Sequence, residues 1–87
     1  MSDAPWQISK IVETAISLKQ TGGTAASTGE RIAGAFVLNR MDLLPDGYGD
    51  VVEAWDRLGD EWQHYVRTVK REYMHLIYED SDDVPRR

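Results

Sequence analysis

The sequence has no cysteine and no long apolar run, and these absences narrow the possible classes of protein. A chain without cysteine forms neither a disulfide framework nor a thiolate site for zinc or redox chemistry, and it is compatible with a reducing cytoplasm. No apolar stretch approaches the ~20 residues that span a bilayer. The first residues also lack the basic segment and apolar run of a secretory signal. We therefore expect a soluble, cytoplasmic protein without a membrane partner.

Basic residues are also scarce. The chain has ten Lys and Arg against fifteen Asp and Glu, a formal net charge of −5. This charge repels phosphate backbones and anionic membranes at long range, so we expect nucleic acid to be an unlikely partner. Acidic residues dominate positions 50–61 and return at 79–83, and between them Arg67, Lys70 and Arg71 form a small basic cluster.

Apolar residues recur at helical spacing, and no alternating strand pattern is present. The spacing predicts a first helix over about residues 4–20, which Gly22 and the following glycine end. Ser27 and Glu30 form a capping-box pattern that predicts the start of a second, almost wholly apolar helix. Asp50 is placed to cap a third helix, which Gly59 ends or kinks. A long fourth helix is predicted over about residues 61–79.

These elements predict an all-α fold, a small four-helix domain with a buried second helix and a long amphipathic C-terminal helix. The domain is expected to cover residues 1–79, with a frayed acidic and basic tail at 80–87. The three tryptophans are expected in the core, because Trp55 and Trp62 lie on the apolar stripes of their helices. Tyr48 either folds onto the core or serves as an exposed anchor.

The fourth predicted helix carries the clearest pattern, an apolar stripe about 28 Å long at 1.5 Å per residue. The shorter helices cover its first half more easily than its second. Two-fold pairing is the commonest way to bury such a patch, so we predict a homodimer with contacts at Tyr73, Leu76 and Ile77. The stripe consists of Trp62, Val66, Val69, Tyr73 and Leu76.

Two motifs resemble sites of chemistry. Glu61 to His64 and Glu72 to His75 have the Glu-x-x-His spacing of di-iron helix bundles, but both histidines face away from the apolar stripe and lie roughly 16 Å apart. Residues 21–30 are rich in glycine and open a helix, but glutamate stands where a phosphate loop needs lysine. We expect no enzymatic activity, no catalytic residue, no metal and no cofactor.

The outward face of the fourth predicted helix supplies the candidate binding residues, with an ordinary solvated face as the alternative. Arginine and tyrosine are over-represented at the energetic centres of protein interfaces. The candidate partner-binding residues are Arg67, Arg71, His75 and Tyr78.

We therefore predict a small acidic protein-interaction module, a regulator, adaptor or inhibitor that acts by binding another protein. One version is an inhibitor whose acidic patches mimic nucleic acid. The second hypothesis is a helix-turn-helix DNA-binding regulator, although the helix after Asp50 begins with acids where a recognition helix needs basic or amide side chains. The third is an oligomeric metal-binding helical protein.

Overall fold

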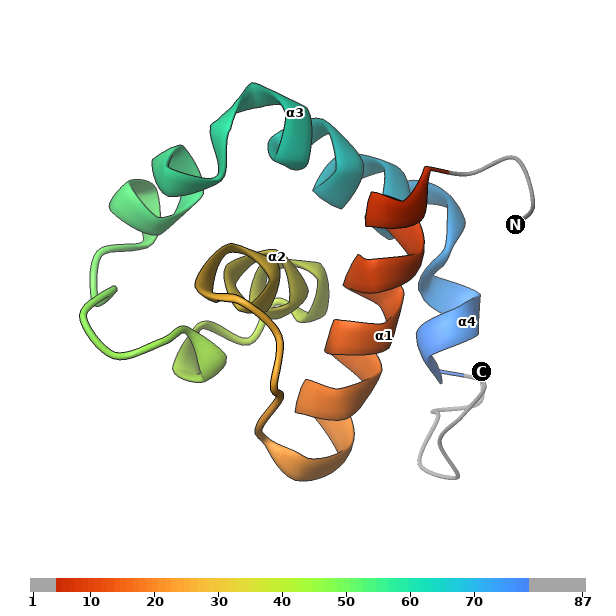
Figure 1. The fold of residues 1–87 in the computed structure, drawn as a ribbon, viewed down its shortest axis with the longest axis horizontal. Helices are drawn as coiled ribbons and strands as arrows, with labels where there is room; N and C mark the ends of the chain where they lie inside the picture. Colours follow the sequence, from red (N-terminus) through yellow and green to blue (C-terminus); the bar gives the residue numbers. More distant parts are fainter. Residues whose placement is uncertain (1–4, 79–87) are drawn as a thin grey trace.

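The computed structural model describes residues 5–78, which form four α-helices and one short 3₁₀ helix. Figure 1 shows α3 crossing over α1 and α2, with α2 seen nearly end-on in the middle and α4 beside α1. The predicted all-α fold with a long C-terminal helix is confirmed. In chain order the elements are α1 (Trp6–Thr21), α2 (Thr28–Leu38), η1 (Met41–Leu43), α3 (Val51–Glu72) and α4 (Met74–Tyr78).

Local capping signals set the end of α1 and the starts of α2 and α3 where the sequence predicted them, whereas α1 begins after Pro5 without a side-chain cap. Gly22 ends α1 in the left-handed conformation with φ of 78°. The Ser27 hydroxyl accepts a hydrogen bond from the Glu30 N–H at 3.2 Å, while the Glu30 carboxylate accepts one from the Ser27 N–H at 3.0 Å. The Asp50 carboxylate accepts from two N–H groups in the first turn of α3, at 2.9 and 3.3 Å. Each cap satisfies backbone groups that a helix end leaves without partners.

Helix α2 is the central buried element, as predicted. At Gly34 an added Cβ would lie only 3.1 Å from side-chain atoms of Leu18 and Thr14, so the absence of a side chain there lets α1 and α2 pack closely. Ala54, with no exposed surface, extends the core from α3. The buried residues of α2 are Ile32, Ala33, Gly34, Ala35, Val37 and Leu38.

Helix α3 bends at Gly59, where φ is 80° and ψ is 166°. Only glycine populates this backbone region readily. The bend folds the two halves of α3 toward each other. This brings the Gln63 side-chain amide close enough to donate a hydrogen bond to the Trp55 carbonyl at 2.8 Å. Eight residues of straight helix would place these two positions about 12 Å apart. The predicted kink at Gly59 is therefore confirmed, and the helices before and after it form one bent element.

The fourth predicted helix over 61–79 is not continuous, and this part of the prediction is wrong. Tyr73 leaves the helical conformation, with φ of −125°, and α4 begins after it and packs against α1. Ile77 on α4 is fully buried, while Leu76 is half-buried. The chain therefore covers the second half of the apolar stripe by turning back on itself. Residue 79 and the predicted frayed tail at 80–87 lie outside the described residues.

The tryptophans divide between the core and the surface, contrary to the expectation that all three are in the core. Trp55 and Trp62 are half-buried and pack against the core, as does Tyr48. Trp6, in the first turn of α1, is 63% exposed, and its ring meets the Trp62 ring in a T-shaped arrangement with centroids 6.1 Å apart. None of the helices in residues 5–78 is long and apolar enough to cross a membrane.

Candidate functional site

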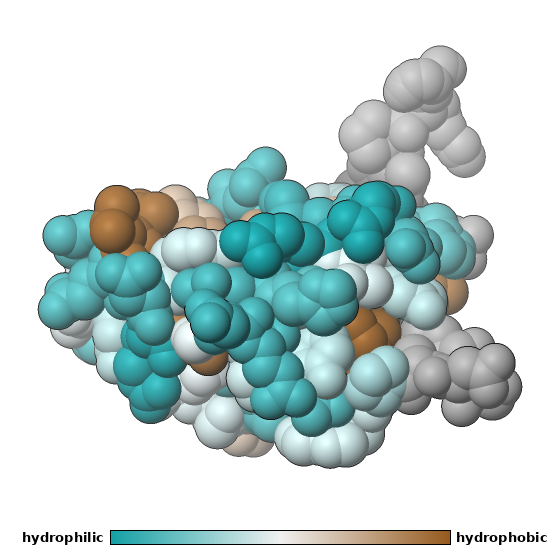
Figure 2. Space-filling model, turned by 90° about the horizontal axis from the view of Figure 1, so that it is seen from above, coloured by the Kyte–Doolittle hydropathy of each residue, from teal (hydrophilic) through white to brown (hydrophobic). Residues whose placement is uncertain are grey.

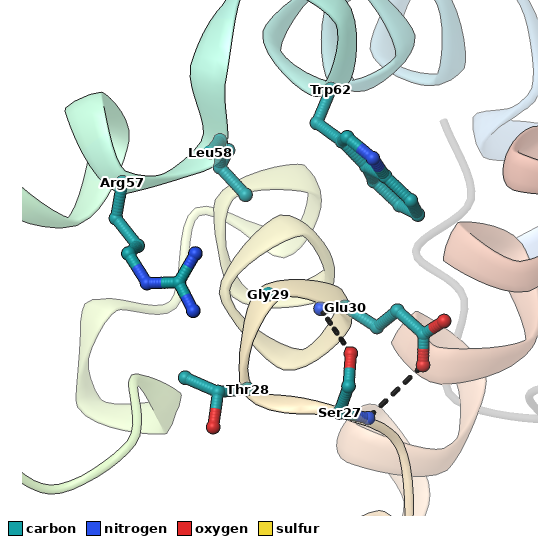
Figure 3. A pocket seen from close by; sticks show the side chains of 7 residues that line it. All are labelled: Ser27, Thr28, Gly29, Glu30, Arg57, Leu58 and Trp62. Carbon is teal, nitrogen blue, oxygen red and sulfur yellow. Dashed lines mark hydrogen bonds between the residues drawn. The ribbon is translucent and has the colours of Figure 1, made fainter.

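The first hollow of the molecule lies at the beginning of α2, and we call it the start hollow. It has a volume of about 450 Å³. Figure 3 shows the Arg57 side chain reaching from α3 toward the first turn of α2, with Trp62 on the other side of Leu58. The residues that line it are Ser27, Thr28, Gly29, Glu30, Arg57, Leu58 and Trp62.

Two polar side chains of the start hollow, those of Ser27 and Glu30, already accept hydrogen bonds from each other's backbone N–H groups. Ser27 and Glu30 complete the capping box across it, which occupies the serine hydroxyl and one oxygen of the carboxylate. A helix N-terminus attracts anions, but the Glu30 carboxylate adds negative charge at this point. The arrangement therefore serves the start of α2 and does not resemble a phosphate site.

The second hollow lies between the end of α2 and α3, and we call it the end hollow. Its volume is about 270 Å³. The floor is apolar: the Phe36 and Trp55 rings meet edge to face with centroids 5.1 Å apart, and Val66 is buried beside them. The residues that line it are Phe36, Asn39, Trp55, Val66, Arg67 and Lys70, none of which is acidic.

Two exposed cations form the rim of the end hollow. The Arg67 guanidinium lies 5.4 Å from the centre of the Trp55 ring, within cation–π distance. The Lys70 ammonium donates to the Phe36 carbonyl and to the Asn39 side-chain oxygen, both at 3.1 Å. This places Lys70 at the C-terminus of α2, the negative end of its helix dipole.

The bend at Gly59 creates the end hollow. Twelve residues separate Trp55 from Arg67, which corresponds to about 18 Å along a straight helix. The bend reduces the gap to a direct contact. Because Phe36 comes from a third segment, α2, sequence spacing could not group these residues. The kink-forming glycine between the two halves of an amphipathic helix was the only signal available.

The structure does not gather the four predicted partner-binding residues into one site. Arg67 belongs to the end hollow, whereas the Tyr78 ring on α4 lies under the Lys19 ammonium of α1 at 5.3 Å. Arg71 is exposed and forms a 3.6 Å ion pair with Glu72. His75 is exposed on α4. The break at Tyr73 separates the face of α3 from that of α4, which explains the scatter.

The predicted dimer contacts are also divided. Ile77 has no exposed surface and belongs to the core of its own chain, whereas Tyr73 and Leu76 are half-buried. The physical reason is again the break in the helix, which turns Ile77 toward α1. Within residues 5–78 no three His, Asp or Glu side chains come together as metal ligands, and both His64 and His75 are exposed.

Three side chains, those of Arg40, Asp42 and Tyr65, have shifted pKa values. Arg40 and Asp42 form a two-point ion pair with 2.9 and 2.8 Å contacts, and its hydrogen bonds lower the pKa of Asp42 and raise that of Arg40. Burial raises the pKa of Tyr65, and its 3.1 Å hydrogen bond to Glu61 acts in the same direction. Because Arg40 is paired, it offers less net charge to the end hollow than Arg67 and Lys70 do.

Comparison of the chain with models of known protein families, with curated proteins and with solved structures finds no match. The surface chemistry therefore carries the functional argument. Figure 2 shows that the face formed by α3 is mainly hydrophilic, with apolar surface in small separate areas. Val51 and Val52, 42% and 67% exposed, are among the exposed apolar residues of α3. Against this background the end hollow combines apolar and cationic groups in one place.

Proposed function

We propose that this chain is a small, acidic protein-interaction module, a regulator, adaptor or inhibitor that works by binding another protein. The observation that carries the proposal is the end hollow, where an exposed arginine covers a half-buried tryptophan. Arginine and tryptophan are the residue types most enriched among interface residues with large binding energies. A cytoplasmic setting is part of the proposal, since a chain without cysteine needs no oxidising compartment to fold.

The size of the end hollow also supports protein binding. Pockets for cofactors and small substrates usually enclose about 300–1,000 Å³, and the end hollow, at about 270 Å³ and open to solvent, is smaller. It has room for a side chain of a partner protein. Its lining offers one guanidinium, one ammonium and one amide as polar groups, a set suited to fixing the orientation of a partner.

Affinity capture from the native host extract tests the proposal, with the retained proteins identified by mass spectrometry. The wild-type chain should retain a specific protein that Arg67→Ala loses. Arg57→Ala makes the same change in another exposed arginine of α3, at the start hollow, and should keep the partner. Equal capture by both variants, or capture of no specific protein, would contradict the proposal.

We also propose that the chain pairs with a second copy through Leu76 and Tyr73, which keep part of their apolar surface in water. Light scattering at micromolar concentration should give twice the chain mass, and Leu76→Asp should reduce it to one chain. His75→Asp, at an exposed neighbouring position, is the matched control. A monomer up to millimolar concentration would contradict pairing.

A further inference from the structure

We propose that the end hollow binds an acidic peptide segment of the partner protein, with one medium-sized apolar side chain inserted between carboxylates. This inference rests on the proposed function and adds the chemistry of the partner. The hollow has two parts with different preferences, an apolar floor and a cationic rim. A ligand that satisfies both must carry an apolar anchor and negative charge within a few residues of each other.

The apolar floor of the end hollow favours an aliphatic side chain as the anchor of the peptide. Phe36 and Trp55 form an edge-to-face pair on which an aliphatic side chain can pack, and Val66 closes the bottom with 1% of its surface exposed. Burying a leucine-sized side chain in such a place gains about 1.5–3 kcal/mol when burial is complete. The volume of about 270 Å³ has room for one such side chain.

The cationic rim of the end hollow favours negative charge on the peptide. Lys70 is held by two hydrogen bonds to the end of α2, and Arg67 is held over the Trp55 ring, so neither long side chain must be ordered from a free state on binding. Pre-ordered groups lose less conformational entropy and bind more tightly for the same contacts. An ammonium has three donors, of which Lys70 uses two within the chain. The guanidinium fork suits a carboxylate geometrically.

The number of cations favours a peptide over nucleic acid. Duplex binding at physiological salt requires many phosphate contacts, and the end hollow provides only two cations on a chain with a net charge of −5. A short peptide with two to four carboxylates can reach both cations of the rim. The start hollow suits an acidic peptide less well, because the Glu30 carboxylate adds negative charge beside Arg57, the one cation among its lining residues.

Titration of the uniformly ¹⁵N-labelled full chain with defined peptides tests the inference. The probe is the blocked peptide Asp-Asp-Leu-Asp-Asp, and the readout is the NMR signal of the Trp55 indole N–H. We expect a saturable shift of this signal and of backbone signals around Phe36 and Lys70. Raising the salt from about 50 to about 500 mM should weaken binding several-fold, because screening reduces the attraction of exposed charges.

Three matched comparisons define the specificity. Asp-Asp-Ser-Asp-Asp, which lacks the apolar anchor, and Lys-Lys-Leu-Lys-Lys, which reverses the charge, should each bind at least about tenfold more weakly. Arg67→Glu should weaken binding of the leucine probe about tenfold, whereas Arg57→Glu, the same charge change at the start hollow, should leave it unchanged. The dispersed amide spectrum of each variant shows that it is folded.

Several results would overturn the inference. These are shifts centred on another surface, equal binding of the serine peptide, equal weakening by both arginine variants, or no shift at millimolar peptide. A Trp55 shift that follows protein concentration without peptide would assign the hollow to a second copy of the chain and would also overturn it. If affinity capture still yields an Arg67-dependent partner, the proposed function stands and only the peptide chemistry fails.

Discussion

The two hollows lie at opposite ends of α2 and differ in the charges of the side chains that line them. The start hollow is larger, about 450 Å³, but Ser27 and Glu30 bond to each other there and hold the helix terminus. The end hollow is smaller, about 270 Å³, with an apolar floor and with Arg67 and Lys70 on its rim. Volume alone is therefore a poor guide to a binding site, because the larger hollow is the one whose polar side chains hold a helix terminus. The charge of the lining is the better guide, because the start hollow sets Glu30 beside Arg57, whereas the end hollow has two cations and no acid beside its apolar floor.

The substitution expected to disturb this comparison most is Gly59→Ala, because the end hollow depends on the bend. A non-glycine residue at φ of 80° and ψ of 166° is strained by about 1–3 kcal/mol. We expect the free energy of unfolding, measured by chemical denaturation, to fall by about 2 kcal/mol. The leucine probe should also bind more weakly, because any relaxation of the bend moves Arg67 away from Trp55.

Gly29→Ala is the control for this prediction. Gly29 lines the start hollow inside α2, has no positive φ, and an added Cβ would meet no atom within 4 Å. Because alanine is the better helix former, we expect stabilisation of about 0.5 kcal/mol and unchanged peptide binding. Equal effects of the two substitutions would mean that the bend does not shape the end hollow.

The next largest effect separates stability from binding. Ser27→Ala removes the hydroxyl of the capping box and should lower the free energy of unfolding by about 1 kcal/mol without changing peptide affinity. Lys70→Met should do the reverse, with several-fold weaker binding of the leucine probe and a stability change within about 0.5 kcal/mol, as is usual for exposed positions. If both variants changed the same property, the functional distinction between the hollows would be lost.

The sequence predicted well those features that depend on neighbouring residues. The capping box at Ser27, the cap at Asp50, the stop at Gly22 and the kink at Gly59 are all present. Each is a local backbone requirement that one or two side chains meet. The burial of α2 was equally predictable, because a helix with almost no polar side has to lie inside the domain.

The break at Tyr73 could not be predicted from the pattern. The apolar spacing continues through it, and neither glycine nor proline marks the position. The same stripe fits a straight helix that is uncovered at its end and a broken helix that turns back onto α1. The gain from burying Ile77 against α1 decides between them, and that gain depends on packing of distant segments.

The end hollow could not be predicted from the sequence either, for a related reason. It combines Phe36 of α2 with Trp55 and Arg67 from the two sides of the bend in α3. The sequence indicated a bend but not its angle, and the angle determines which side chains meet. Of the predicted partner residues only Arg67 is in the hollow, because the others were chosen on the assumption of one straight helix.

The smallest expected effect concerns the Arg40–Asp42 pair, which follows α2 next to Asn39 of the end hollow. Hydrogen bonding to Arg40 lowers the pKa of Asp42 in the folded chain. The pair therefore stabilises the fold above the unfolded pKa of about 3.9. This stabilisation is lost as the pH falls through the lower, folded pKa. NMR titration of the Asp42 carboxyl should show the lowered value, and Arg40→Gln should return it toward the ordinary one.

Asp42→Asn then tests whether pairing limits the charge near the end hollow. Without its carboxylate partner, Arg40 adds a third cation close to the rim, and the leucine probe should bind more tightly by less than about twofold, since exposed charges are strongly screened. The gain should disappear at high salt. Tighter binding that survives high salt, or weaker binding at low salt, would mean that Asp42 acts on the hollow through its shape rather than its charge. The attraction assigned to Arg67 and Lys70 would then need the same re-examination.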